Sequence, residues 1–225
     1  MPKRSKQVKK TDRTKAWHKR KPKPPKLGIR KQNPTILIVC EGQTEECYFE
    51  SFPVLSLTVT TVNLGGQSKL QLVEAAMELK KEQEYDSVWC VFDMDINRGE
   101  KEFADFDNAI EKAQSQNMEV AYSNDAFELW FYLHYHFTDQ EHRRDFYYQE
   151  LGKLWGCSYE REGKKRRFCD QIYSKLLDSE TANQEDAIKY AEKLFDRQEN
   201  EPPHKQNPVT LVHKLVSSLN ENLRP

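Results

Sequence analysis

Four short apolar runs alternate with segments of helical pattern, and this alternation constrains the fold more than any other feature of the chain. The apolar runs cover residues 35–40, 54–64, 87–92 and 118–122. The helical patterns between them cover residues 44–49, 69–84 and 105–117. Short apolar runs suit strands covered on both faces, and strands joined by helices form mainly parallel sheets. The sequence therefore predicts an α/β fold, with a mainly parallel sheet flanked by helices.

The second half of the chain has a helical pattern throughout. Residues 126–137 are so rich in aromatic and apolar side chains that they predict a helix buried between other elements. Residues 184–199 predict a charged helix, and Pro208 at a first turn predicts a last helix over residues 209–219. We expect three parts: a basic arm at residues 1–32, an α/β core at residues 33–138, and a mostly helical part at residues 139–225 that packs on the core.

The formal net charge of −1 hides a strong asymmetry along the chain. Residues 1–31 hold 14 basic residues and one acid, Asp12, whereas the remainder holds 21 basic and 35 acidic residues. So few apolar residues cannot offset the ordering entropy, and we expect a disordered arm. Its charge favours contact with a nucleic-acid backbone, and a solubilising tail is the alternative. The expected contacts in the arm are Lys9, Lys10, Arg13, Trp17, Lys19, Arg20 and Lys21.

Two other basic positions are candidates for contact with nucleic acid. Lys69 follows a Gly-Gly-Gln-Ser sequence that could cradle a phosphate, although the Walker pattern is absent and a plain loop is the alternative. A basic run between aromatic residues is either a second nucleic-acid contact or a solvated face. The run consists of Lys164, Lys165, Arg166 and Arg167.

Acidic residues follow two of the predicted strands. Glu41 comes directly after the first strand, and Asp93 and Asp95 come after the third. Parallel strands bring their carboxyl ends to one edge of a sheet, where ligands of α/β proteins bind. Clustered carboxylates repel one another unless a cation neutralises them, and a set of hard oxygen ligands suits Mg²⁺ or Mn²⁺. Such an ion can stabilise charge on a phosphoryl group and activate a water. Acids that merely cap helices or occupy turns are the alternative.

Several classes of protein are disfavoured. No run approaches the ~18 consecutive apolar residues of a membrane helix, and the N-terminus lacks the apolar stretch of a secretory signal. The five cysteines are odd in number and form no CxxC pair, which favours a cytoplasmic protein without a disulfide framework or structural zinc. His134 and His136 would diverge on a helix, so we expect core or surface histidines rather than metal ligands.

Four segments in this order resemble the RloB/AbiLii family of restriction-modification and abortive-infection loci. They read ILIVCEGQTEECYFESF, VWCVFDMDIN, YSNDAFELWFYLHYHF and NPVTLVHKLV, and the resemblance covers roughly residues 33–219. The family is similar to the Toprim superfamily of topoisomerases, primases and OLD nucleases. The resemblance implies a Toprim-like fold that binds a divalent metal, Mg²⁺ or Mn²⁺, for phosphodiester chemistry.

The resemblance also implies roles for individual residues. Glu41 matches a glutamate assigned as a general acid/base or metal ligand, and Asp93 and Asp95 match a metal-binding Asp-x-Asp pair. Glu45 and Glu128 match further acids of the family that could also bind metal. Glu45 could instead stabilise its helix dipole, and Glu128 could be a buried acid paired with a base. Where the family has a proline, this chain has Asp125, which either adds a ligand or caps a helix.

Three functions fit these observations. The first is a metal-dependent nuclease of Toprim type, acting on DNA or RNA, tRNA included, in anti-phage defence. Related systems imply a separate ATPase as a regulatory partner. The second is a non-catalytic subunit that binds nucleic acid or a partner, and the third is phosphoryl transfer on a small nucleotide. Homo-oligomerisation stays open.

Overall fold

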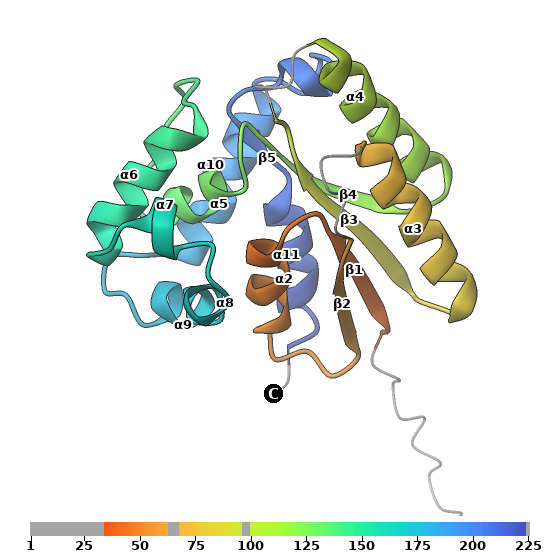
Figure 1. The fold of residues 1–225 in the computed structure, drawn as a ribbon, viewed down its shortest axis with the longest axis horizontal. Helices are drawn as coiled ribbons and strands as arrows, with labels where there is room; N and C mark the ends of the chain where they lie inside the picture. The colour runs from red at the N-terminus through yellow and green to blue at the C-terminus, as the bar shows by residue number, and fades with distance from the viewer. Residues whose placement is uncertain (1–33, 63–67, 96–99, 224–225) are drawn as a thin grey trace, which may run out of the picture. The chain divides into compact units, whose positions relative to one another are not determined.

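The computed structural model describes residues 34–62, 68–95 and 100–223. Within these ranges a five-stranded sheet has the order β2-β1-β3-β4-β5, with β1 to β4 parallel and β5 antiparallel to β4 (Figure 1). The strands are β1 (Ile36–Cys40), β2 (Leu57–Thr61), β3 (Ser87–Asp93), β4 (Glu119–Asn124) and β5 (Val209–Thr210). The predicted α/β fold with a mainly parallel sheet is confirmed. The predicted arm at residues 1–32 lies outside the described residues.

Helices connect the strands and form most of the chain beyond β4. Between the parallel strands they are α2 (Gln43–Glu50), α3 (Lys69–Glu82) and α4 (Glu100–Ser115). Beyond β4 they are α5 (Glu128–Leu133), α6 (Arg144–Trp155), α7 (Tyr159–Glu162), α8 (Arg166–Cys169), α9 (Ile172–Leu177), α10 (Gln184–Asp196), the 3₁₀ helix η3 (Pro203–Lys205) and α11 (Val212–Asn220). The predicted helical C-terminal part is therefore confirmed. No described helix is long and apolar enough to cross a membrane.

Side chains alternate along β1 between two hydrophobic cores, one on each face of the sheet. Ile36 and Ile38 pack with α2, α5 and α11, whereas Leu37 and Val39 pack with α3 and α4 on the opposite face (Figure 1). All four side chains are buried. Because both faces of this strand are covered, its sequence is apolar without interruption, which is the pattern that predicted it.

The prediction of one helix over residues 209–219 is wrong at its start. Val209 and Thr210 form β5, which pairs with Ser123 and Asn124 of β4, and α11 begins only at Val212. The hydroxyl groups of Ser123 and Thr210 lie 2.8 Å apart and add a side-chain hydrogen bond to this pairing. A two-residue strand has no periodicity of its own, so only its distant partner in β4 specifies it.

Two helices begin without a side-chain cap from their own N-cap residue. Gly42 is the N-cap residue of α2, and Thr44 lies buried inside the helix. At α3 the hydroxyl group of Ser68 makes no capping bond; instead the Lys69 backbone N–H donates to the Asp105 carboxylate at 2.6 Å. A side chain from α4 therefore caps α3, an arrangement that local sequence does not reveal.

Candidate active site

A pocket of about 280 Å³ opens at the carboxyl ends of β1 and β3. The two strands are parallel neighbours with Cys40 opposite Val91, and the Glu41 backbone N–H donates to the Val91 carbonyl at 2.9 Å. This pairing brings Glu41 and Asp93 to the same edge of the sheet, where open α/β sheets bind ligands. The pocket is lined by Glu41, Gly42, Gln43, Thr44, Glu45, Asp93, Asp95, Glu128, Arg144, Tyr148 and Lys164.

Two further acids enter the pocket from helices that begin beside this edge. Glu45 lies in the first turn of α2, and Glu128 is the first residue of α5. Both are nearly buried, with 7% and 5% of their surface exposed. The structure thus brings together, in one pocket, the five acids predicted to bind metal, although they come from three separate segments of the chain.

Gly42 allows the Glu45 side chain to fold back over the start of α2. A Cβ atom on Gly42 would lie 2.5 Å from Glu45 Oε2, which is closer than nonbonded atoms approach. The backbone of Gly42 is extended, with φ of −127°, so a side chain at this position meets no conformational strain. Glycine is therefore required here for the position of a carboxylate rather than for the path of the chain.

Burial and the charge of neighbouring acids shift the pKa of two of the acids. Burial, followed by the charge of Asp93, raises the pKa of Glu45 from 4.5 to about 8. Burial and Asp93 also raise the pKa of Glu128, while Lys164 opposes this rise. Each additional negative charge in so small a volume favours protonation of its neighbours. The negative charge of the pocket therefore favours the binding of cations.

Lys69, the first residue of α3, supplies one cation. Its side chain is fully buried, and Nζ lies 2.6 Å from both carboxylate oxygens of Glu41 and 3.5 Å from Glu102 Oε1. Burial alone would lower the pKa of Lys69, but the charges of Glu41 and Asp93 outweigh it and the pKa is raised. The sequence suggested Lys69 as a nucleic-acid contact; in this structure its ammonium group faces Glu41 and has no solvent-exposed surface.

Arg144, the first residue of α6, supplies a second cation that the sequence did not single out. Its Nη2 atom lies 3.6 Å from Asp93 Oδ2 and 3.8 Å from Asp95 Oδ1. The backbone N–H of Arg144 donates to Asp125 Oδ2 at 2.9 Å, so Asp125 anchors the start of α6. Nothing in the local pattern distinguishes Arg144 from other basic residues on helix surfaces, because only the tertiary fold brings α6 to the sheet edge.

Lys164 and Tyr148 also line the pocket, and Tyr159 contacts one of its acids. Lys164 Nζ lies 5.2 Å from the centre of the Tyr148 ring, within range of a cation–π interaction. The hydroxyl group of the buried Tyr159 donates to Glu128 Oε1 at 3.2 Å. Of the basic run at residues 164–167, Lys164 is the member that lines the pocket with the five acids. Neither tyrosine was among the residues predicted from sequence.

The other predicted nucleic-acid contacts lie elsewhere. Arg166 pairs with Glu46 and Glu50 of α2 and with Asp170, at 2.9, 2.7 and 3.0 Å, and so ties α8 to α2. Lys165 and Arg167 line a separate shallow pocket with Phe168. The predicted contacts in the arm, Lys9, Lys10, Arg13, Trp17, Lys19, Arg20 and Lys21, are outside the described residues.

Histidine and cysteine contribute little to this site. Buried His134 directs Nδ1 to the Trp130 carbonyl at 2.9 Å, and burial lowers its pKa to about 4. This contact makes it a core histidine, as the sequence favoured. All five cysteines are free thiols.

The donor chemistry of the pocket fits a divalent cation of the magnesium type, since its acids offer only carboxylate oxygens. Within residues 34–62, 68–95 and 100–223, however, no three His, Cys, Asp or Glu side chains are already arranged to hold a metal ion. Instead, Lys69 pairs with Glu41, and Arg144 pairs with Asp93 and Asp95. A metal ion would therefore have to replace part of this internal charge pairing.

Comparison with known proteins assigns the chain to a family. The model of the RloB-like protein family matches residues 36–219, and the chain therefore belongs to this family. Membership suggests a protein associated with defence. A comparison with curated proteins found no match. The match runs from β1 to α11 and so includes every acid of the pocket.

Proposed function

We propose that this protein is a divalent-metal-dependent nuclease of Toprim type that acts as an effector of anti-phage defence. The observation that carries the proposal is the convergence of Glu41, Glu45, Asp93, Asp95 and Glu128 in one pocket at the carboxyl edge of a parallel sheet. Isolated acids on a surface would serve as caps or solvated groups. Burial and the charge of Asp93 raise the pKa of Glu45 and of Glu128, and this electrostatic cost is one that cation binding would relieve.

Each group of the pocket has a defined task in this proposal. Asp93 and Asp95, with Glu45 or Glu128, would hold Mg²⁺ or Mn²⁺. When bound, the ion supplies positive charge for the phosphoryl group and an acidified water. The Lys69 ion pair orients the carboxylate of Glu41, and an oriented carboxylate can accept a proton from an attacking water.

The basic arm provides the affinity for nucleic acid that an acidic body lacks. Residues after position 31 carry 35 acids against 21 basic residues, so the body on its own repels a polyanion. A separate ATPase remains the expected regulatory partner, and DNA and RNA are both candidate substrates.

Cleavage assays with purified protein test the proposal. Wild-type protein is incubated with single-stranded and duplex DNA and RNA in Mg²⁺, in Mn²⁺ and in EDTA. We expect metal-dependent cleavage that Asp93→Asn abolishes. Glu119→Gln is the matched control, because Glu119 is an exposed acid at the opposite end of the same sheet. Equal cleavage by wild type and Asp93→Asn would reject the assignment of this pocket.

The second candidate is a non-catalytic subunit that binds nucleic acid or a partner. One observation favours it: Lys69 already pairs with Glu41, and Arg144 already pairs with Asp93 and Asp95. In that case wild-type protein would bind nucleic acid without cleaving it in either metal, and Asp93→Asn would bind equally well.

A further inference from the structure

Beside its acids the pocket has basic residues as well. Arg144 and Tyr148 stand four residues apart on α6 and so share one face of the helix, and Lys164 approaches from the segment after α7. We propose that these residues form a binding subsite for a phosphodiester group of the substrate, with Arg144 as its main positioning residue. The subsite rests on the proposed function, which it extends to the recognition of substrate.

Two nitrogen atoms of the Arg144 guanidinium group are hydrogen-bond donors without an acceptor in the described part of the chain. Its Nε and Nη2 atoms are buried, and neither has a hydrogen-bond partner among the described residues. The contacts of Nη2 with Asp93 and Asp95, at 3.6 and 3.8 Å, are ion pairs that exceed hydrogen-bonding distance. Buried donors are rarely left unpaired, so these two atoms suit a ligand that offers acceptor oxygens. Phosphate offers such oxygens in the geometry that arginine binds best.

The main chain of Arg144 is fixed independently of its side chain. The hydrogen bond from its backbone N–H to Asp125 holds the start of α6 whichever group the guanidinium contacts. The guanidinium can therefore change partners, from the two aspartates to a phosphate, while the helix stays in place. Lys164, above the ring of Tyr148, adds a second positive charge beside it.

Replacement of Arg144 should have different effects on cation binding and on phosphodiester binding. Because the guanidinium pairs with Asp93 and Asp95, it competes with any divalent cation for these acids. Its removal should therefore strengthen cation binding and weaken phosphodiester binding. A residue that only maintained the shape of the pocket would weaken both when it is replaced.

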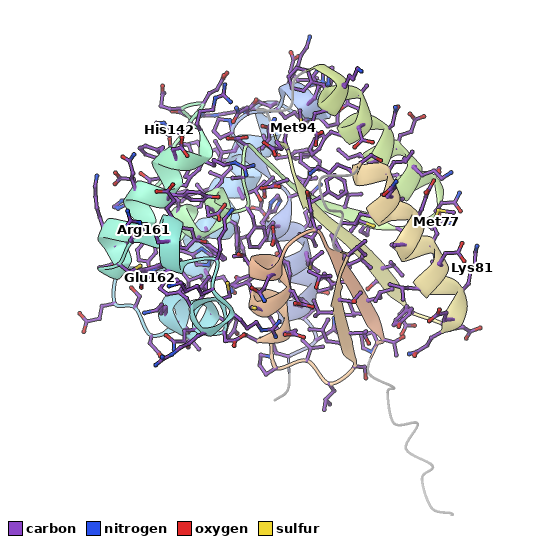
Figure 2. The ribbon with its side chains drawn as sticks, in the orientation of Figure 1. Met77, Lys81, Met94, His142, Arg161 and Glu162 are labelled. Atoms are coloured by element: carbon purple, nitrogen blue, oxygen red, sulfur yellow. The ribbon has the colours of Figure 1, made fainter. Side chains whose placement is uncertain are left out.

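The test compares full-length wild type, Arg144→Gln and Arg144→Lys by isothermal titration. One titration uses Mn²⁺ without nucleic acid, and the other uses the dinucleotide thymidylyl-thymidine in Ca²⁺, a probe too short to depend on the arm. Arg161→Gln is the control, because Arg161 is exposed on α7 and does not line the pocket (Figure 2). Circular dichroism establishes that each variant is folded.

We expect Arg144→Gln to bind Mn²⁺ about tenfold more tightly and the dinucleotide about tenfold more weakly than wild type, as for the loss of one charged hydrogen-bonding group. Arg144→Lys should lie between the two, and Arg161→Gln should match wild type. Unchanged or weaker Mn²⁺ binding by Arg144→Gln, or undiminished dinucleotide binding, overturns the subsite. If Arg144→Gln does not fold, Arg144→Lys decides by the same two shifts. If both affinities change as expected but wild-type protein cleaves no nucleic acid, the subsite is supported and the proposed nuclease activity is rejected.

Discussion

At the scale of a single residue, burial changes the pKa of the Glu45 carboxyl group. Its pKa of about 8 lies far above the ordinary value of 4.5, first because of burial and then because Asp93 and Glu128 are close. Between these two values the folded protein keeps a proton that the unfolded chain releases. Stability must therefore fall as pH rises across this window, since the folded state binds more protons than the unfolded state.

Thermal unfolding in EDTA checks this expectation for the metal-free protein. The melting temperature of wild type should decrease between about pH 5 and pH 8, with a loss in unfolding free energy on the order of a few kcal/mol. Glu45→Gln removes the titrating group and should flatten the profile, so that the variant is the more stable protein at pH 8. Parallel profiles for the two proteins would show that Glu45 is not the source.

A substitution at Gly42 should change metal binding while leaving the stability of the fold nearly unchanged. Gly42→Ala should displace the Glu45 carboxylate and weaken Mn²⁺ binding, while unfolding free energy in urea changes by less than about 1 kcal/mol, since the backbone there is unstrained. Gly156→Ala is the matched control with the opposite outcome. Gly156 has φ of +64°, and a methyl group on its Cα would meet no atom within 4 Å, so alanine there should cost about 1 kcal/mol through the backbone and leave Mn²⁺ binding unchanged.

The acids of the site could be predicted residue by residue, but the pairing of basic residues with them could not. Glu41, Asp93 and Asp95 stand directly after apolar strands, where chain order alone fixes the edge of the sheet that they reach. Arg144 depends on how α6 packs, and Lys69 was placed correctly on a helix without any indication that it would be buried. Charge pairing across distant segments has no signature in a single sequence.

At the scale of elements, the ion pair between Lys69 and Glu41 joins the start of α3 to the end of β1. Lysine is rarely buried completely, and here the carboxylates of Glu41 and Glu102 compensate the charge of its ammonium group. The backbone N–H of Lys69 also donates to Asp105. Removing one partner of a buried pair leaves the other without compensation, which costs more than the pair contributed.

Lys69→Met should therefore lower the unfolding free energy by about 3 to 5 kcal/mol, measured in urea. The double variant Lys69→Met, Glu41→Gln should recover part of this loss, because it removes the uncompensated carboxylate as well. Additive losses in the double variant would mean that the two groups do not depend on each other.

Strands and helices differ in how far sequence specifies their ends. The parallel strands were located to within a few residues, since a strand covered on both faces is apolar throughout. The buried helix predicted for residues 126–137 is shorter, because the His134 carbonyl after α5 accepts a hydrogen bond from the Asn183 backbone. Such an end is set by a tertiary contact, as is strand β5.

At the scale of the whole molecule, the chain combines an acidic body with a basic arm, and the two have opposite effects on a polyanion. Affinity for nucleic acid should come mainly from the arm and should weaken as salt rises, because bound cations are released from the phosphates. Chemistry should depend on the pocket alone.

A charge-neutralised arm in the full-length chain tests this division. The variant replaces six basic residues with glutamine: Lys9, Lys10, Arg13, Lys19, Arg20 and Lys21. The salt dependence of duplex binding should become shallower by up to about 5 units of log–log slope. Turnover of bis(p-nitrophenyl) phosphate, which is too small to reach the arm, should change by less than about twofold. Lys81→Gln, an exposed lysine on α3, should leave both quantities unchanged (Figure 2). A slope that does not change would place the nucleic-acid interface elsewhere.

The central claim is that the acids of the pocket bind a divalent cation, and anomalous diffraction from crystals grown with Mn²⁺ tests it most directly. The account predicts an anomalous peak in the pocket, with carboxylate oxygens of Asp93 and Asp95 about 2.1 Å away. The peak should disappear in crystals of Asp93→Asn. A well-ordered pocket without a peak at saturating Mn²⁺, with Arg144 still paired to the two aspartates, would contradict the account.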